Sequence, residues 1–164
     1  MSEVILEAMR RRDIKTVAAI EDLCFPEPWS ERLLNDELRL ANRRYMVARI
    51  NNDIVGYVGW MFVDDEVHVN TIATIPDLRG HGIASRLLLE GIGVAVERGV
   101  TGVTLEVGAT NSAAQRLYQY FGLAPVGVRR GYYAGGEDAI VMWNREIASD
   151  TDRLRRDEIA RGLG

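Results

Sequence analysis

The strongest constraint on the fold is a predicted strand that leads through a glycine-bearing turn into a long apolar helix. Residues 67–75 are rich in β-branched side chains, which favour strands, and Pro76 and Asp77 end this segment. Apolar residues at helical spacing then continue to Arg98. Such a β-turn-α unit is typical of α/β domains, in which helices cover the faces of a sheet.

Hydrophobic periodicity extends this pattern along the whole chain. Further strands are predicted at residues 4–9, 45–50, 54–63, 101–107, about 123–130 and 138–147, and further helices at 14–23, 30–40 and 111–121. The predicted order is therefore β-α-α-β-β-β-α-β-α-β-β, in one α/β domain.

Polar residues mark where the shorter helices begin. Asp13 is expected to cap the first of them and Ser30 the second, while Asn111 opens the helix that Gly122 closes. The buried face of the first helix is expected to consist of Ile14, Val17, Ile20 and Leu23.

Length and composition favour a single soluble domain. A chain of 164 residues can bury a core without cross-links, and its one cysteine, Cys24, excludes an intrachain disulfide. No apolar run approaches the ~20 residues that span a membrane, and the N-terminal segment lacks the pattern of a secretory signal. We therefore expect a cytoplasmic protein that does not bind membranes.

Charge patterning limits the partners further. A net charge of -4 with mixed signs argues against direct binding of nucleic acid, which needs many Lys and Arg side chains on one face. No His, Cys or carboxylate cluster has the spacing of metal ligands, so no metal is expected. Residues 149–164 are almost all charged and are predicted to form a solvated or frayed helix that follows a domain of residues 1–148.

The segment Arg79-Gly80-His81-Gly82-Ile83-Ala84 lies where the predicted strand passes into the long helix. Unpaired backbone N–H groups and the helix dipole suit such a junction to an anion, and two glycines let a diphosphate approach the backbone. The segment has neither the Gly-Lys-Ser/Thr ending of a P-loop nor the G-x-G-x-x-G spacing of a dinucleotide site. By itself it is equally consistent with a tight turn, so its surroundings must decide.

In these surroundings, Arg-x-x-Gly-x-Ala after a strand resembles the acetyl-CoA loop of the GNAT acetyltransferase superfamily. Other segments are similar to its RimI-type branch, the ribosomal-protein alanine N-acetyltransferases: Phe25 to Glu31, Leu105-Glu106-Val107, Asn111, Leu117-Tyr118, Arg129 to Tyr133, and Glu137-Asp138-Ala139. The resemblance covers roughly residues 3–147. Two positions depart from it, because two residues separate Pro26 from Trp29 and because Gly108 replaces an Arg after Glu-Val.

The resemblance implies a mixed, mostly antiparallel sheet of about seven strands flanked by about four helices. It also implies acetyl-CoA as co-substrate, with strand amides on the pantetheine arm and thioester, the loop on the diphosphate, and an asparagine near the arm. The residues that it assigns to this site are Ile72, Ala73, Thr74, Arg79, Gly80, His81, Gly82, Ile83, Ala84, Ser85 and Asn111.

Acetyl transfer to an amine needs a base for the amine proton and an acid for the departing thiolate. The resemblance assigns these roles to Glu106 and Tyr118. Glu106 otherwise reads as a surface or paired carboxylate at the end of a strand, and Tyr118 as a core residue in an apolar helical stripe. His68, alone or with Glu66, is the second candidate for the base.

Aromatic residues are the predicted contacts of the acceptor. The resemblance places a tyrosine at Tyr132 or Tyr133 against the substrate, and Trp29 follows the two prolines of a predicted loop. The same residues are also consistent with a hydrophobic plug and a covered hairpin edge. The candidates for an acidic rim that receives a basic second residue of the substrate are Glu31, Glu137 and Asp138, which are equally consistent with solvated surface charges.

The sequence therefore predicts direct transfer of acetyl from acetyl-CoA to the N-terminal α-amine of a protein, as in ribosomal proteins that begin with Ala. A covalent acyl-enzyme is not expected, because no His lies near Cys24 in the sequence. Two alternatives remain at this point. One is the same chemistry on a small amine or a Lys side chain, and the other is a non-catalytic sensor of acyl-CoA.

Overall fold

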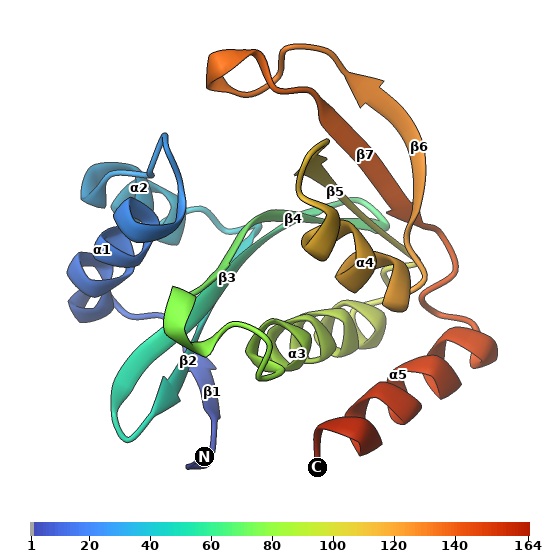
Figure 1. The fold of residues 1–164 in the computed structure, drawn as a ribbon. Helices are drawn as coiled ribbons and strands as arrows, with labels where there is room; N and C mark the ends of the chain where they lie inside the picture. The colour runs from blue at the N-terminus through green and yellow to red at the C-terminus, as the bar shows by residue number, and fades with distance from the viewer. Residues whose placement is uncertain (1) are drawn as a thin grey trace. The chain divides into compact units, whose positions relative to one another are not determined.

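The computed structural model describes residues 2–164, which form a seven-stranded sheet and five α-helices (Figure 1). The strand order is β1-β2-β3-β4-β5-β7-β6. The β4–β5 pair is parallel, whereas the β1–β2, β2–β3, β5–β7 and β6–β7 pairs are antiparallel. The predicted mixed, mostly antiparallel sheet is confirmed.

The predicted order of elements is also confirmed. The strands are β1 (Ile5–Ala8), β2 (Arg43–Ile50), β3 (Asp53–Val63), β4 (Glu66–Thr74), β5 (Gly102–Gly108), β6 (Ala124–Arg129) and β7 (Ala139–Asn144). The helices are α1 (Ile14–Cys24), α2 (Glu31–Leu38), α3 (Ile83–Glu97), α4 (Ser112–Tyr120) and α5 (Asp150–Leu163).

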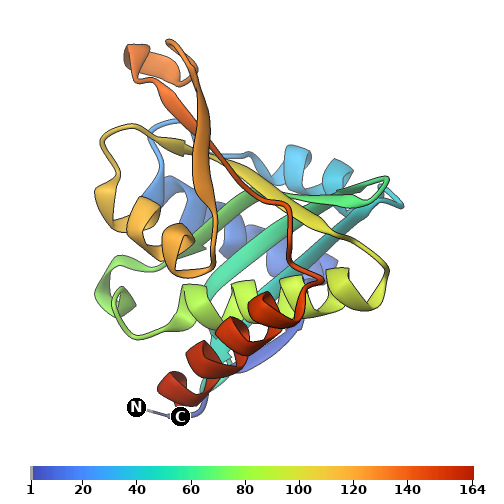
Figure 2. The same ribbon diagram turned by 90° about the vertical axis from the view of Figure 1, so that its right-hand side faces the viewer.

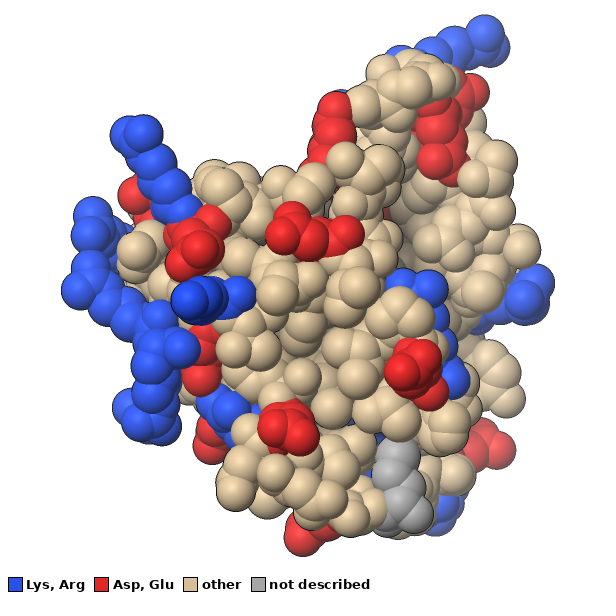
Figure 3. Space-filling model, turned by 60° about the vertical axis from the view of Figure 1, so that its left-hand side comes forward, with Lys and Arg blue, Asp and Glu red and all other residues tan. Residues whose placement is uncertain are grey.

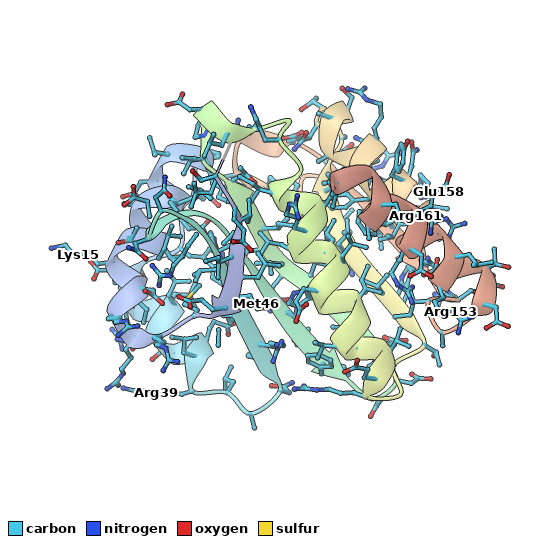
Figure 4. The ribbon with its side chains drawn as sticks, turned by 90° about the horizontal axis from the view of Figure 1, so that it is seen from below. Lys15, Arg39, Met46, Arg153, Glu158 and Arg161 are labelled. Carbon is cyan, nitrogen blue, oxygen red and sulfur yellow. The ribbon has the colours of Figure 1, made fainter. Side chains whose placement is uncertain are left out.

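The chain forms two compact units. The first unit comprises Met1–Met61 and Asn70–Glu90, and the second comprises Phe62–Val69 and Gly91–Gly164. In the first unit α1 and α2 lie side by side (Figure 1) over a core that includes the fully buried Val17, Leu34 and Tyr57. Lys15 of α1 points away from this core (Figure 4).

The prediction of the buried face of α1 is wrong at one residue. Leu23 is 67% exposed, and the buried position is Glu21, which is 1% exposed. The reason is the helical period, because seven residues make two turns and place Glu21 below Ile14, whereas Leu23 lies half a turn away. A buried carboxyl on a core-facing helix needs its own explanation.

The predicted cap of α1 differs in detail from the structure. Arg11–Asp13 forms a 3-10 turn before α1, so Asp13 already has helical φ and ψ and its side chain does not cap the helix. Its carboxylate instead accepts hydrogen bonds from the Arg10 amide at 2.9 Å and from Arg49 at 2.6 Å. The caps at Ser30 and Asn111 are confirmed, since each side chain accepts from the amide three residues later.

In the second unit β6 and β7 run side by side as a long hairpin (Figure 2), and β7 also pairs with β5. The core of this unit includes Leu105, Phe121 and Met142, which are at most 2% exposed. Gly122 ends α4 with φ +81°, a left-handed conformation that glycine adopts without strain.

Residues 150–163, within the predicted charged tail, form the regular helix α5 of the second unit. Ser149 caps it by accepting from the Asp152 amide at 3.1 Å. Asp152 is 2% exposed and accepts a hydrogen bond from Asn144 of β7 at 2.8 Å. The labelled residues of α5 in Figure 4, Arg153, Glu158 and Arg161, are exposed. One face of α5 is therefore fixed through a buried carboxylate.

The face drawn in Figure 3 carries both signs of charge, in keeping with the net charge of -4. Among the described residues, no helix has the length and apolar character needed to cross a membrane, and no three His, Cys or carboxylate side chains are grouped as metal ligands would be.

Gly56 of β3 is a position where the first unit has no room for a side chain. A Cβ there would lie 2.9 Å from the carbonyl oxygen of Ala73 and 3.0 Å from Cγ2 of Ile83. We expect Gly56→Ala to lower the free energy of unfolding by about 1–3 kcal/mol, because backbone atoms must move. Gly93→Ala is the control. Its Cβ would meet no atom within 4 Å, so alanine should stabilise α3 by about 0.5–1 kcal/mol. Urea unfolding measures both variants, and equal effects would contradict the close packing at Gly56.

Candidate functional site

The structure brings the two candidates for the base together in the second unit. Nε2 of His68, on β4, lies 2.7 Å from Oε2 of Glu106, on β5. The parallel register pairs His68 with Thr104, which places Glu106 two residues further along the neighbouring strand. The side chains are 25% and 14% exposed, so the pair is partly shielded from water while still reached by it.

Arg129 of β6 completes the surroundings of this pair, with Nε 3.5 Å from Oε1 of Glu106. The hydrogen bond with His68 lowers the pKa of Glu106, burial acts against this, and the charges of His68 and Arg129 add to the lowering. Glu106 is therefore held as a carboxylate, the form that accepts a proton.

Tyr118 of α4 is 6% exposed, which agrees with its place in an apolar stripe. Burial raises the pKa of its hydroxyl, and the nearby Tyr133 adds to this shift. The hydroxyl consequently keeps its proton at neutral pH, as an acid must before it reacts. The core position and a proton-donating role are thus compatible for this residue.

The two tyrosines predicted to contact the acceptor form an edge-to-face pair after β6. The ring centroids of Tyr132 and Tyr133 are 5.1 Å apart at an interplanar angle of 86°, and Arg129 lies 5.9 Å from the centre of the Tyr132 ring. Tyr132 is 52% exposed. Burial, then Tyr132 and the charge of Glu106, raise the pKa of Tyr133 to about 12. The aromatic pair therefore belongs to the same surroundings as Glu106.

Glu137 and Asp138 hold the loop between β6 and β7 in place. Oε1 of Glu137 accepts hydrogen bonds from the amide and the hydroxyl of Thr110, at 3.0 and 2.5 Å, and these bonds lower the pKa of Glu137. Asp138 accepts from the amide of Gly131 at 2.8 Å. A Cβ at Gly108 would lie 2.7 Å from Oε1 of Glu137. The glycine that departs from the RimI-type pattern thus makes room for this carboxylate.

The predicted diphosphate loop lies in the first unit. Gly80 and Gly82 both have φ +80°, which other residues rarely adopt, and α3 begins at the next residue, Ile83. Nε of Arg79 donates to the carbonyl oxygen of Thr74 at 3.4 Å, and this hydrogen bond attaches the loop to the end of β4. The first amides of a helix have no intrahelical acceptor, so they can donate hydrogen bonds to a bound anion. Around Gly80 a Cβ would find open space.

The remaining cofactor candidates divide between the units. Ile72, Ala73 and Thr74 lie on the part of β4 that belongs to the first unit, together with the loop, whereas Asn111 belongs to the second. Asn111 accepts from the amide of Ala114 at 3.1 Å, so its role as a helix cap is established. The contacts of all these residues with a cofactor stay a prediction.

Trp29 lies in the loop between α1 and α2, partly buried against the core of the first unit. Its backbone amide donates to Oε1 of Glu21 at 3.2 Å. Sequence reasoning missed Glu21, although the position of this residue one helical repeat after Ile14 could have indicated its burial. Glu31, from the predicted acidic rim, is exposed at the start of α2.

The chain is similar to known proteins in sequence and in fold. Residues 14–123 match the acetyltransferase (GNAT) family. The N-alpha-acetyltransferase RimI of Mycobacterium tuberculosis is 37% identical over 146 residues, which cover 85% of this chain and 90% of that protein. The ribosomal protein bS18-alanine N-acetyltransferase of Escherichia coli is 31% identical over 142 residues, 84% of this chain and 94% of that protein. A crystal structure of the ribosomal-protein-S18-alanine N-acetyltransferase from Escherichia coli has a TM-score of 0.81 at 28% identity and covers 90% of this chain and 97% of that one.

Proposed function

Because the chain belongs to the GNAT acetyltransferase family and is similar to its RimI-type members, we propose that it transfers acetyl from acetyl-CoA to the N-terminal α-amine of a protein. The observation that carries this proposal is the His68–Glu106 pair, a partly buried carboxylate at 2.7 Å from an imidazole. A non-catalytic sensor of acyl-CoA would have no need of such a pair.

Glu106 is the proposed base. An α-amine has a pKa near 8 and is mostly protonated at neutral pH, so a carboxylate must take a proton, directly or through one water, before the nitrogen attacks the thioester carbon. The N–C bond then forms as the C–S bond breaks. His68 donates a hydrogen bond to the Glu106 carboxylate and orients it, and Tyr118 gives its proton to the departing sulfur.

The glycine loop and the end of β4 are the proposed site of acetyl-CoA. Arg79 and the first amides of α3 would hold the diphosphate, and the backbone of Ile72 to Thr74 would hold the pantetheine arm. The β4–β5 register consists of the pairs at Glu66, Val67 and His68. This short register supports the assignment, because Ile72 to Thr74 lie beyond it. The bound thioester supplies the acyl group, and no metal is invoked.

The proposed acceptor is the N-terminal Ala of a ribosomal protein, by analogy with the Escherichia coli relative, whose name states this substrate. Tyr132, Tyr133 and Trp29 would contact the first residues of the peptide. We also propose that residues 1–148 contain the catalytic domain and that α5 is an addition which stabilises it, because Asp152 is bound to Asn144 of β7.

The test is mass spectrometry of a mixture with acetyl-CoA and three acceptors. These are an Ala-Arg-Tyr-Phe peptide, the same peptide with a blocked N-terminus and an internal Lys, and a polyamine. We expect an added acetyl group on the free N-terminus alone. Acetylation of the blocked peptide or the polyamine would instead assign the enzyme to Lys side chains or small amines. Binding of acetyl-CoA with no acetylated product would favour the sensor.

A further inference from the structure

Glu21 is a buried carboxyl group that the proposed chemistry does not use. The residue is 1% exposed, in the middle of the first unit. Oε1 accepts the hydrogen bond from the amide of Trp29 at 3.2 Å, whereas Oε2 is buried without a hydrogen-bond partner among the described residues. A buried polar atom left unpaired costs about 1–3 kcal/mol, so an apolar residue would serve the core better.

Tyr57 connects the surroundings of Glu21 to β4. Tyr57 is fully buried. Burial raises the pKa of Glu21, and the hydroxyl of the neighbouring Tyr57 acts against this shift. The same hydroxyl lies 3.0 Å from Oγ1 of Thr71. Thr71 directly precedes Ile72 to Thr74, the strand residues that we assign to the pantetheine arm.

A second contact joins the same elements. Sγ of Cys24, at the end of α1, donates to the carbonyl oxygen of Thr74 at 3.5 Å. The C-terminal half of α1 is therefore attached to β4 at Thr74, and Tyr57, whose hydroxyl influences the pKa of Glu21, is hydrogen-bonded to β4 at Thr71. Glu21 lies on this half of α1 and is the residue that holds the Trp29 backbone.

We propose that Glu21 is a positioning residue, which fixes the Trp29 loop relative to β4 so that the loop receives the acceptor peptide next to the strand that holds the acetyl donor. The part of this inference that concerns the acceptor peptide rests on the proposed function. The attachment of the Trp29 amide by Glu21 is independent of that function.

The chemistry of the attachment indicates which substitutions separate its parts. The amide of Trp29 needs an acceptor, which a Gln side chain supplies through its carbonyl oxygen and a Leu side chain does not. Because burial disfavours the charged carboxylate, a neutral amide of the same shape should be tolerated at this position. Leu fills the space of Glu and keeps the core packed, so the fold should survive both changes.

We expect Glu21→Leu to raise the KM for the peptide about tenfold, as the loss of a hydrogen bond worth about 1.4 kcal/mol would, and to leave the Kd of acetyl-CoA within about twofold. Glu21→Gln should keep the KM within about twofold of wild type. Glu37→Leu is the matched control. Glu37 is also a buried carboxyl, 8% exposed, but it accepts from Tyr45 at 2.7 Å and from Arg43 at 2.9 Å and does not hold the Trp29 loop. The Glu37→Leu variant should have a lower melting temperature than wild type and an unchanged KM for the peptide.

Amide hydrogen exchange of Trp29, followed by NMR, needs no substrate and tests the attachment alone. Exchange should be about tenfold faster in Glu21→Leu and unchanged in Glu21→Gln and Glu37→Leu. Unchanged exchange in Glu21→Leu would overturn the inference, as would an equal rise in KM for Glu37→Leu. A wild-type protein that acetylates no peptide but shows the expected exchange would overturn the proposed function and leave the attachment established.

Discussion

Replacing Glu106 by Gln is expected to lower kcat by about 10²–10⁴-fold, the usual cost of losing a general base. The amide keeps the shape of the side chain and can still hydrogen-bond to His68, so the fold and the Kd of acetyl-CoA should change little. Steady-state kinetics with a free-N-terminus peptide and calorimetric titration with acetyl-CoA measure the two quantities. In the wild type, the lowered pKa of Glu106 should place the acid limb of kcat/KM below the ordinary range of a carboxyl group.

Two further variants decide what the loss in Glu106→Gln means. Glu97→Gln changes an exposed glutamate of the same unit and should leave kcat within about twofold of wild type. His68→Gln should cost less than Glu106→Gln if His68 only orients the carboxylate. A larger loss in His68→Gln would make His68 the base, and unaltered turnover in Glu106→Gln would remove Glu106 from the mechanism.

Replacing Asp152 by Ala is expected to lower the free energy of unfolding by about 3–5 kcal/mol, because it leaves several buried partners of a carboxylate unpaired. The side chain is 3% exposed and forms ion pairs with Arg155 and Arg156. It also accepts from Asn144 at 2.8 Å. Urea unfolding followed by circular dichroism measures the loss.

Asp150→Ala provides the matched control for this variant. Asp150 lies in the same first turn of α5 and pairs with Arg153 at 3.6 Å, but its side chain is 90% exposed. Surface pairs of this kind contribute little, so the change should stay within about 0.5 kcal/mol. If both variants lost the same stability, the helix dipole or the propensity of α5, rather than the buried carboxylate, would be responsible.

Most of the fold could be predicted from the sequence because its elements carry strong local signals. The strands β2 and β3 follow from continuous apolar runs, and the turn at Asn51 and Asn52, which have φ of 50° and 73°, follows from turn chemistry. Glu21 and Asp152 show where such signals fail. Each is a charged residue that tertiary contacts bury, and composition alone predicts both to be exposed.

The candidate site could be predicted as a set of residues but not as an arrangement. Glu106 and Tyr118 came from motifs that resemble a family, and His68 remained a separate alternative. Their relation depends on the parallel pairing of β4 with β5, in which His68 is opposite Thr104. Strand register between segments more than thirty residues apart is set by the completed sheet, so the local sequence could not show that His68 and Glu106 are partners.

The buried hydrogen bond between Asn144 and Asp152 also has a consequence for the order in which the protein is made. Asn144 donates through one amide nitrogen to the carbonyl oxygen of Phe121 and to Asp152, so part of the bonding of β7 depends on α5, the helix that follows it. Domains generally fold as units during translation. Before α5 has left the ribosome, Asn144 of β7 lacks its partner Asp152. The second unit therefore reaches its full stability only after α5 has emerged.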